Sequence, residues 1–215
     1  MQQLSESVDL VSFADVNDPE ALAGFIKESG FPAIVKPKTS SGSRSIQIVQ
    51  NEGQLKTALE RNDSSIIQEY IDDAGGEFSV GVFVCDEFSS AIAFKRDLGP
   101  VGCSWYAETS YDKDVLDYAM NVARASHLRG SANVQLRNSS KGPRLLEINP
   151  RFSSLVAARA ICGFLDLEWS IDIEFGWKPE ITSQPYKKIR FRRYFQEAVD
   201  FCDGFMSVPE WSVNR

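Results

Sequence analysis

Hydrophobic positions in the first third of the chain switch between helical and strand spacing. Apolar residues recur with a helical period after Pro19, and Gly30 ends that pattern before a short apolar run, which Lys36 and Pro37 are expected to stop. The elements predicted here are a helix over residues 19–29, a strand over 31–35, a loop over 39–45, a strand that includes Ile46 and Ile48, and a helix over 52–61. Together they describe a small α+β lobe.

The rest of the chain shows a longer series of antiparallel strands with helices beside them. The predicted strands cover residues 65–71, 77–85, 89–95, 132–137, 144–149 and 188–194, and the predicted helices cover 115–128, 154–161 and 166–175. The inner side of the first of these helices is expected to carry Leu116, Met120, Val122 and Ala123. Turn-forming residues near 68–76 mark the expected boundary between two lobes, residues 1–70 and 71–215.

Composition indicates a globular protein with a real core. Hydrophobic residues make up 43% of the 215 positions. The net charge of -7 argues against a general affinity for nucleic acid or anionic membranes, which attract basic surfaces. The N-terminus has no basic and then apolar leader pattern, and the most apolar later run, residues 155–165, is interrupted by Arg159. We therefore expect a soluble, cytoplasmic protein without nucleic-acid or membrane partners.

Cysteine and histidine offer little chemistry in this sequence. The four cysteines are far apart, so neither a zinc site nor a disulfide framework is expected from Cys85, Cys103, Cys162 and Cys202. His127 falls late in an amphipathic helix, where the helix dipole ordinarily explains a histidine. We assign His127 no catalytic role.

A lysine followed by a loop of small residues is the first candidate for binding chemistry. Lys36 follows an apolar run, and the loop of Ser, Gly and Arg residues after it extends to Ser45. Small side chains let backbone N–H groups approach phosphate oxygens, while the lysine supplies a point charge. The Gly-Lys-Ser/Thr ending of a Walker loop is absent. Taken alone, such a cluster is more often a solvated turn.

A polar stripe on a predicted hairpin is the second candidate. Strand alternation places five side chains on one set of faces, with apolar residues opposite: Gln135, Arg137, Glu147, Asn149 and Arg151. Carboxylate and amide oxygens suit Mg²⁺, which takes few protein ligands and keeps positions for water and phosphate oxygens. The alternative is the wet face of a half-exposed sheet, and the stripe alone does not decide between the two.

Together, the two candidates resemble a known family. Residues 31–45, the segment Ile66-Ile-Gln-Glu-Tyr-Ile71 with Glu77, and residues 135–151 occur in the order and spacing of ATP-grasp enzymes. They are most similar to the carbamoyl phosphate synthetase large-chain and biotin carboxylase branch, and the resemblance covers residues 8–194. It implies an α+β, ATP-grasp fold in which ATP lies between a lid lobe, residues 1–70, and a lobe that carries the metal ligands, residues 71–215.

The resemblance also implies roles for individual residues around the nucleotide. Lys36 would contact the phosphates beneath a mobile loop. The Gln68 carbonyl and the Ile71 N–H would read the adenine edge, and Glu77 would accept hydrogen bonds from the ribose hydroxyls. The implied nucleotide-binding positions are Lys36, Ser41, Gly42, Ser43, Gln68, Glu69, Ile71 and Glu77.

For the metal and the chemistry, the resemblance points to the polar stripe. Mg²⁺ or Mn²⁺ would be shared by Gln135, Glu147 and Asn149, and Arg151 would face the transferring phosphoryl group. The implied catalytic positions are Glu147, Asn149 and Arg151. Lys95 and Arg96 match the family only loosely, and exposed cations at strand ends are usually just solvated.

The implied function is a ligase that activates a carboxylate as an acyl phosphate, which an amine or ammonia then attacks. Its partners would be these small molecules, together with an N-terminal domain in cis or a partner chain in trans, because no segment here matches the family's N-terminal domain of about a hundred residues. The sequence also leaves open whether the protein forms a homodimer. The alternatives are a non-catalytic, regulatory ATP-binding module and a carbamoyl phosphate synthetase-like fragment that uses bicarbonate. The carbamoyl phosphate synthetase-like fragment ranks lower because the loop at 102–105 lacks the histidine that the corresponding loop of those enzymes carries.

Overall fold

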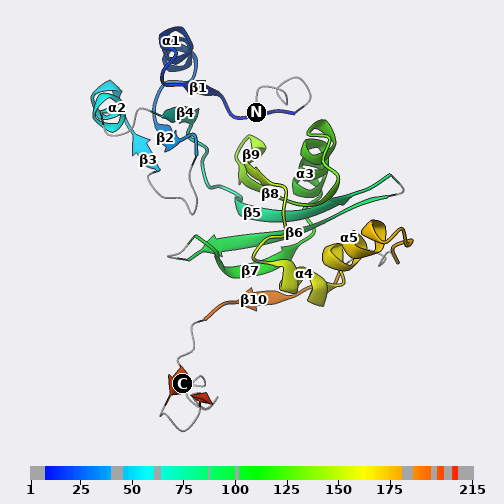
Figure 1. Cartoon of the computed structure of the whole chain (residues 1–215). Coiled ribbons are helices and arrows are strands. Elements are labelled where there is room, and N and C mark those ends of the chain that lie inside the picture. Colours follow the sequence, from blue (N-terminus) through cyan, green and yellow to red (C-terminus); the bar gives the residue numbers. More distant parts are fainter. Residues whose placement is uncertain are drawn as a thin grey trace.

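The structure, a computed structural model, describes residues 8–39, 46–60, 64–86, 88–99, 102–180 and 186–194, with the backbone of 198–200 and 205–207. Two antiparallel sheets with helices beside them make up most of it (Figure 1). The smaller sheet has the order β1-β4-β2-β3. Its strands are β1 (Phe13–Asp15), β2 (Ala33–Pro37), β3 (Gln47–Val49) and β4 (Ser65–Glu69).

Two helices pack on one side of the smaller sheet, and both begin at a side-chain cap. Asp18 accepts hydrogen bonds from the N–H groups of Glu20 and Ala21 at the start of α1 (Pro19–Glu28). Asn51 accepts from the N–H of Gln54 at the start of α2 (Glu52–Leu59). These caps satisfy donors that the first helical turn leaves unpaired. The core between helices and sheet includes Ala14, Phe25, Ala33, Val35, Val49, Leu55, Ala58 and Ile67.

The larger sheet has six strands in the order β10-β7-β6-β5-β8-β9, all antiparallel. They are β5 (Gly76–Val84), β6 (Ser89–Leu98), β7 (Ser104–Ser110), β8 (Gly130–Ser139), β9 (Gly142–Asn149) and β10 (Arg190–Arg192). Helix α3 (Lys113–Ala125) lies on one face, and α4 (Val156–Cys162) and α5 (Asp166–Glu174) lie on the other (Figure 1). A separate pair of strands, β11 (Ala198–Asp200) and β12 (Phe205–Ser207), follows. None of the described helices is long and apolar enough to cross a membrane.

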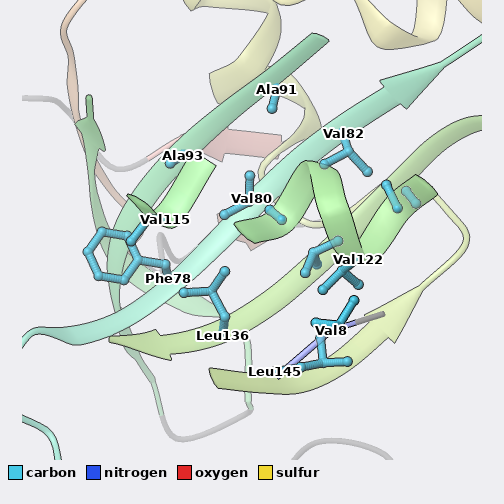
Figure 2. Close-up of a cluster of buried hydrophobic side chains, with 14 residues drawn as sticks. Val8, Phe78, Val80, Val82, Ala91, Ala93, Val115, Val122, Leu136 and Leu145 are labelled. Carbon is cyan, nitrogen blue, oxygen red and sulfur yellow. The ribbon is translucent and has the colours of Figure 1, made fainter. Parts of the chain in front are cut away.

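The α3 face of the larger sheet carries a core of mostly aliphatic side chains together with Phe78, which Figure 2 shows. Strand residues such as Val80, Leu136 and Leu145 pack there against the helix. The inner side of α3 differs from the expected one at two of its four positions, because the buried residues are Val115, Ala119, Val122 and Ala123. Leu116 and Met120 are only partly buried at the edge of this core.

The opposite face is aromatic beneath α4 and α5 and polar farther along. Trp169 of α5 is fully buried among Phe83, Phe88 and Phe164, with ring centroids 5.1–5.5 Å apart. Edge-on contacts of this kind add stability beyond the burial of area. Toward β8 and β9 the same face carries amide, hydroxyl and charged side chains, which form the candidate site.

Several element boundaries differ from those expected. Strand β2 continues through Lys36 and Pro37, which pair with Ile66 and Ser65 of β4, so Pro37 does not stop it. A proline is tolerated at a strand end, where its missing N–H interrupts no interior ladder. Strand β6 runs on to Leu98, beyond the predicted end at 95. Strands β1 and β7, and the pair β11 and β12, were not predicted.

The N-terminal segment joins the two sheets a second time, beside the direct connection at 70–75. Tyr118 donates its hydroxyl to the Asp9 carbonyl at 2.8 Å and accepts from the Leu145 N–H at 3.0 Å. Arg144 forms an ion pair with the Asp9 carboxylate at 2.8 Å. Val8 is buried in the α3-face core (Figure 2). The chain is therefore fixed to the larger sheet just before it enters β1 of the smaller one.

Candidate functional site

Polar side chains predicted on the hairpin lie on one face of β8 and β9, and a β-bulge in β9 sets this arrangement. Gln135 of β8 lies opposite Glu147 of β9, whereas Leu136 lies opposite Leu145, so Leu146 is an extra residue on β9. A bulge of this kind re-aims the side chains around it. Leu145 therefore belongs to the α3-face core, while Glu147 is exposed.

Arg96 of β6 is the centre of the polar cluster. Its Nη2 donates to Oε1 of Glu77 and to Oε1 of Gln135, both at 2.7 Å, and its Nε donates to Glu77 at 3.2 Å. Only 6% of the Arg96 side chain and 17% of the Glu77 side chain are exposed. A buried, doubly bonded pair holds a fixed geometry. Arg96 is thus not the solvated strand-end cation that the sequence suggested, and it fixes the orientation of the Gln135 amide.

A second arginine, Arg137, binds the other carboxylate oxygen of Glu77. Arg137 of β8 donates to Oε2 of Glu77 at 3.2 Å and to the carbonyl of Ile71 at 3.3 Å, and it lies 3.8 Å from Asp73. Both oxygens of Glu77 are therefore engaged with guanidinium groups. A carboxylate accepts about four hydrogen bonds, so Glu77 keeps acceptor capacity for the ribose hydroxyls that the resemblance assigns to it.

Beside this cluster lies a hollow of about 450 Å³. It is lined by Asp73, Gly76, Glu77, Lys95, Arg96, Asp97, Leu98 and Arg137. Gly76, with φ of 90°, forms part of its wall, and a Cβ atom there would lie 2.5 Å from Cε of Lys95. Glycine lets the backbone and Lys95 approach each other at the point where the chain enters the larger sheet.

Lys36 of the smaller sheet interacts electrostatically with one member of the stripe, Glu147. Its ammonium group is half-buried, and desolvation lowers the pKa of Lys36, while the negative charge of Glu147 opposes that shift. The two candidates that the sequence presented separately, the lysine and the hairpin carboxylate, are therefore neighbours across the two sheets. Ser41, Gly42 and Ser43 lie outside the residues that the structure describes.

Three predicted positions surround the connection between the sheets. Gln68 is 2% exposed and has register partners Phe13 and Ile34 on both sides, and within the described part of the chain its amide nitrogen has no acceptor. Glu69 accepts from the Ser12 N–H at 3.4 Å. Ile71 lies past the end of β4, and its carbonyl is the one that Arg137 holds. Of these three, only Ile71 has its main chain beyond the sheet.

The donor set for a metal is one carboxylate and two amides. Asn149 ends β9, and its amide nitrogen is buried with no acceptor among the described residues. The described residues contain no cluster of three His, Cys, Asp or Glu side chains that could hold a metal. Oxygen ligands of this kind fit Mg²⁺, which completes its shell with water and phosphate oxygens. Gln135, Glu147 and Asn149 therefore suit a metal that arrives with a nucleotide.

Arg151 is exposed just beyond β9, and its main chain is hydrogen-bonded to Asn149 of the stripe. Its N–H donates to the Asn149 carbonyl at 2.8 Å, and its Nη1 donates to the carbonyl of Phe152 at 3.1 Å. The side chain holds no carboxylate partner among the described residues. Such an arginine keeps its remaining donors for an anion.

Comparison with known proteins now identifies the family. A family model described as ATP-grasp in the biosynthetic pathway with Ter operon matches residues 62–192, more than half of the chain. The chain belongs to the ATP-grasp family. The carbamoyl phosphate synthase large chain of Thermus thermophilus is 27% identical over 154 residues, which cover 64% of this chain and 15% of that protein. This ATP-grasp chain thus corresponds to a small part of that relative.

Solved structures confirm the fold. The N5-carboxyaminoimidazole synthetase of Staphylococcus aureus, complexed with ADP, matches 88% of this ATP-grasp chain and 53% of its own with a TM-score of 0.73 at 14% identity. The biotin carboxylase of Campylobacter jejuni, in a β-γ-ATP complex, matches 83% of this chain and 45% of its own with a TM-score of 0.68 at 17% identity. The chain spans about half of each solved protein. The expected α+β, ATP-grasp fold and the resemblance to this branch are confirmed.

Proposed function

We propose that this ATP-grasp chain is the MgATP-binding catalytic region of a ligase that joins a carboxylate to an amine or ammonia. The observation that carries the proposal is the electrostatic interaction between Lys36 of the smaller sheet and Glu147 of the larger one, which raises the lysine pKa against the effect of burial. In the proposal, this cation serves the phosphates and this carboxylate serves the metal. Family membership supports ATP as the ligand.

In this proposal the two sheets belong to the two lobes that hold the nucleotide. Residues 1–70 form the lid lobe, with Lys36 and the loop of Ser41, Gly42 and Ser43 on the phosphates. Residues 71–215 form the lobe that carries the metal ligands. The adenine edge is read near Gln68, Glu69 and Ile71, and Glu77 accepts from the ribose. The solved structures of similar fold in complex with ADP or a form of ATP support this placement of the nucleotide at the level of the fold.

The metal would be Mg²⁺ or Mn²⁺, held by Gln135, Glu147 and Asn149. Bound there, it would offset charge on the phosphate oxygens. Arg96 holds the Gln135 side chain through its Oε1 at 2.7 Å, so that amide oxygen is already shared with a guanidinium group. With one carboxylate and two amides, the protein offers a single negative charge. We therefore expect metal and nucleotide to bind together, each raising the affinity for the other.

The chemistry proposed is acyl transfer by way of an acyl phosphate. A carboxylate oxygen of the substrate attacks the γ-phosphorus, and the bond to the ADP oxygen breaks. The amine nitrogen then attacks the carbonyl carbon, phosphate leaves, and the amine loses a proton. Lys36 and Arg151 would stabilise the charge on the transferring group. The acceptor side would be completed by a further domain, in cis or as a partner chain.

Nucleotide calorimetry and a trapping assay test the proposal. ADP and ATP are titrated into the protein with and without Mg²⁺, and ADP release is measured with a panel of carboxylates in the presence of hydroxylamine, which converts acyl phosphates to hydroxamates. Metal-dependent binding with carboxylate-dependent hydroxamate supports the ligase. Binding without any carboxylate-dependent release supports the non-catalytic module, and release that depends on bicarbonate alone supports the carbamoyl phosphate synthetase-like fragment. Absence of nucleotide binding with Mg²⁺ overturns the proposal.

A further inference from the structure

Arg159 of α4 is a fully buried arginine that the proposed chemistry does not use. Its side chain is 0% exposed. Nη1 donates to Oδ2 of Asp166 at 3.0 Å, and Nη2 donates to Oδ1 of Asn133 at 2.6 Å. Burial lowers the pKa of Arg159, and the charge of Asp166 opposes this. A guanidinium stays protonated in proteins, so this is a buried charge with one carboxylate partner.

The hydrogen bonds around Arg159 form a polar layer between the larger sheet and the two helices on it. Asn133 Oδ1 also accepts from the Ser79 hydroxyl at 2.6 Å. The Ser131 hydroxyl donates to the same Asp166 oxygen at 2.6 Å. One side chain from α4, one from α5, two from β8 and one from β5 are thus locked together. Apolar residues of similar size often stabilise a fold as well as a buried ion pair does, so the buried charge calls for an explanation beyond packing.

The register of the sheet places this layer directly beside the candidate metal ligands. Asn133 lies opposite Asn149, and Ser79 lies opposite Gln135. Arg159 is therefore hydrogen-bonded to Asn133, the residue opposite Asn149. Through Asn133 it is also linked to Ser79, the residue opposite Gln135. It also belongs to α4, the helix that follows residues 150–155, which are called the Arg151 loop from here on.

The backbone beneath Arg159 is shaped for its guanidinium group. Gly81 of β5 lies opposite Asn133, and a Cβ atom there would lie 2.5 Å from Nε and 2.6 Å from Cζ of Arg159. Real Cβ atoms do not approach other atoms so closely, so a larger residue at Gly81 would displace the guanidinium. Glycine within a strand often marks such a close approach.

We propose that Arg159 is a positioning residue, which holds Asn149, Gln135 and the Arg151 loop in place from the buried side. It acts through Asn133 and Ser79 and does not touch substrate. The inference rests on the proposed function for the identity of the ligand that these residues serve. Groups that hold the residues around a metal ligand set the orientation of that ligand, and their loss weakens metal binding.

Two variants and a control distinguish a role of Arg159 in positioning the metal ligands from a role only in stabilising the fold. Arg159→Met removes the charge and both donors. Gly81→Ala keeps every polar group and pushes the guanidinium aside, so it tests the idea where Arg159→Met fails to fold. Val122→Ala removes buried volume on the opposite face of the sheet, where Val122 is 0% exposed. The first readout is backbone hydrogen exchange of residues 149–155. The second is the Mg²⁺ dependence of ADP binding by calorimetry.

We expect exchange in residues 149–155 to accelerate selectively in Arg159→Met and Gly81→Ala, and not in Val122→Ala. The Mg²⁺ affinity in the presence of ADP should fall about tenfold or more in the first two variants, while ADP binding without metal changes little. Uniform acceleration across the protein in all three variants, or unchanged metal dependence in both site variants, overturns the inference. If the wild-type protein binds ADP without any effect of Mg²⁺, the proposed function fails, and hydrogen exchange alone still decides whether Arg159 positions the loop.

Discussion

Gln135 and Glu147 lie directly opposite each other on β8 and β9, at the point where the extra residue Leu146 shifts the register. Leu145 and Glu147 are two positions apart, so a regular strand would put them on the same face. The bulge instead sends Leu145 into the aliphatic core and leaves Glu147 exposed on the side of the stripe. This shift lets the β9 carboxylate act on Lys36 of the other sheet.

The first prediction concerns Glu147→Ala. The side chain is exposed and contributes a single carboxylate to the donor set, so its loss should abolish the effect of Mg²⁺ on nucleotide affinity. The free energy of unfolding should change by less than about 0.5 kcal/mol, as for most surface substitutions. Calorimetry with and without Mg²⁺ and urea unfolding measure the two effects. Glu174→Ala, exposed on α5, is the control. A Glu147→Ala protein that responds to Mg²⁺ like wild type would remove Glu147 from the site.

The second prediction concerns Arg96→Met. Arg96 is buried and bonded to Glu77 and Gln135, so its removal leaves one carboxylate short of a partner and frees the Gln135 amide. Breaking a buried pair in this way should cost about 3 kcal/mol in the free energy of unfolding. Arg129→Met is the control, because Arg129 and its partner Asp86 are 72% and 75% exposed, and it should leave the urea midpoint unchanged. Similar midpoints for the two variants would contradict the central role of Arg96.

The helices and the main motifs could be predicted from the sequence because their signals are local. Asp18 and Asn51 cap their helices where the polar-to-apolar change begins, and Gly163 ends α4 with a φ of 97°. Lys36 and Glu147 could be predicted as site residues through the family resemblance, which places both at one nucleotide, and these roles stay predictions. Residue spacing by itself says nothing about how the two separate sheets are placed.

The residues that the sequence misjudged are those whose role depends on register. Arg96 comes after a run of small and apolar residues and looks like a solvated strand end. Its role is visible only when Glu77 is seen on the adjacent strand β5 and Gln135 on β8, the strand beyond it. Arg159 interrupts an apolar run, and in the sequence it served only as an argument against a membrane span. In the structure it is fully buried beside Asp166. The signal that could have revealed the pair was an arginine within an apolar run, followed seven residues later by an aspartate near a helix boundary.

The third prediction compares two glycines. Gly24 lies within α1, and a Cβ atom there would meet nothing within 4 Å. Gly24→Ala should therefore stabilise the protein by about 0.5–1 kcal/mol, because alanine loses less entropy in a helix. Gly76→Ala should destabilise it by about 1–2 kcal/mol, because the φ of 90° disfavours any side chain. Urea unfolding measures both. Changes of the same sign would show that one of these backbone conformations is misassigned.

The last prediction follows from the pKa of Lys36. Burial lowers that pKa below the ordinary 10.5, and Glu147 raises it again in part. The unfolded chain then binds more protons than the folded one between the lowered pKa and 10.5. The contribution of Lys36 to stability therefore rises with pH across that window. Binding of phosphate has the opposite sign, because only the ammonium form attracts it.

ADP affinity without metal should accordingly fall as pH rises from neutrality through the pKa of Lys36. Glu147→Gln removes the negative charge that supports the ammonium form, so its affinity should begin to fall at lower pH than that of the wild type. Lys36→Met should bind weakly and show no such fall. Calorimetry in metal-free buffer across this range, with Glu174→Gln as the control for loss of a distant charge, measures all three. Coincident pH profiles for wild type and Glu147→Gln would mean that the two side chains do not interact. The proposal that lysine and carboxylate face one nucleotide site would then lose its main support.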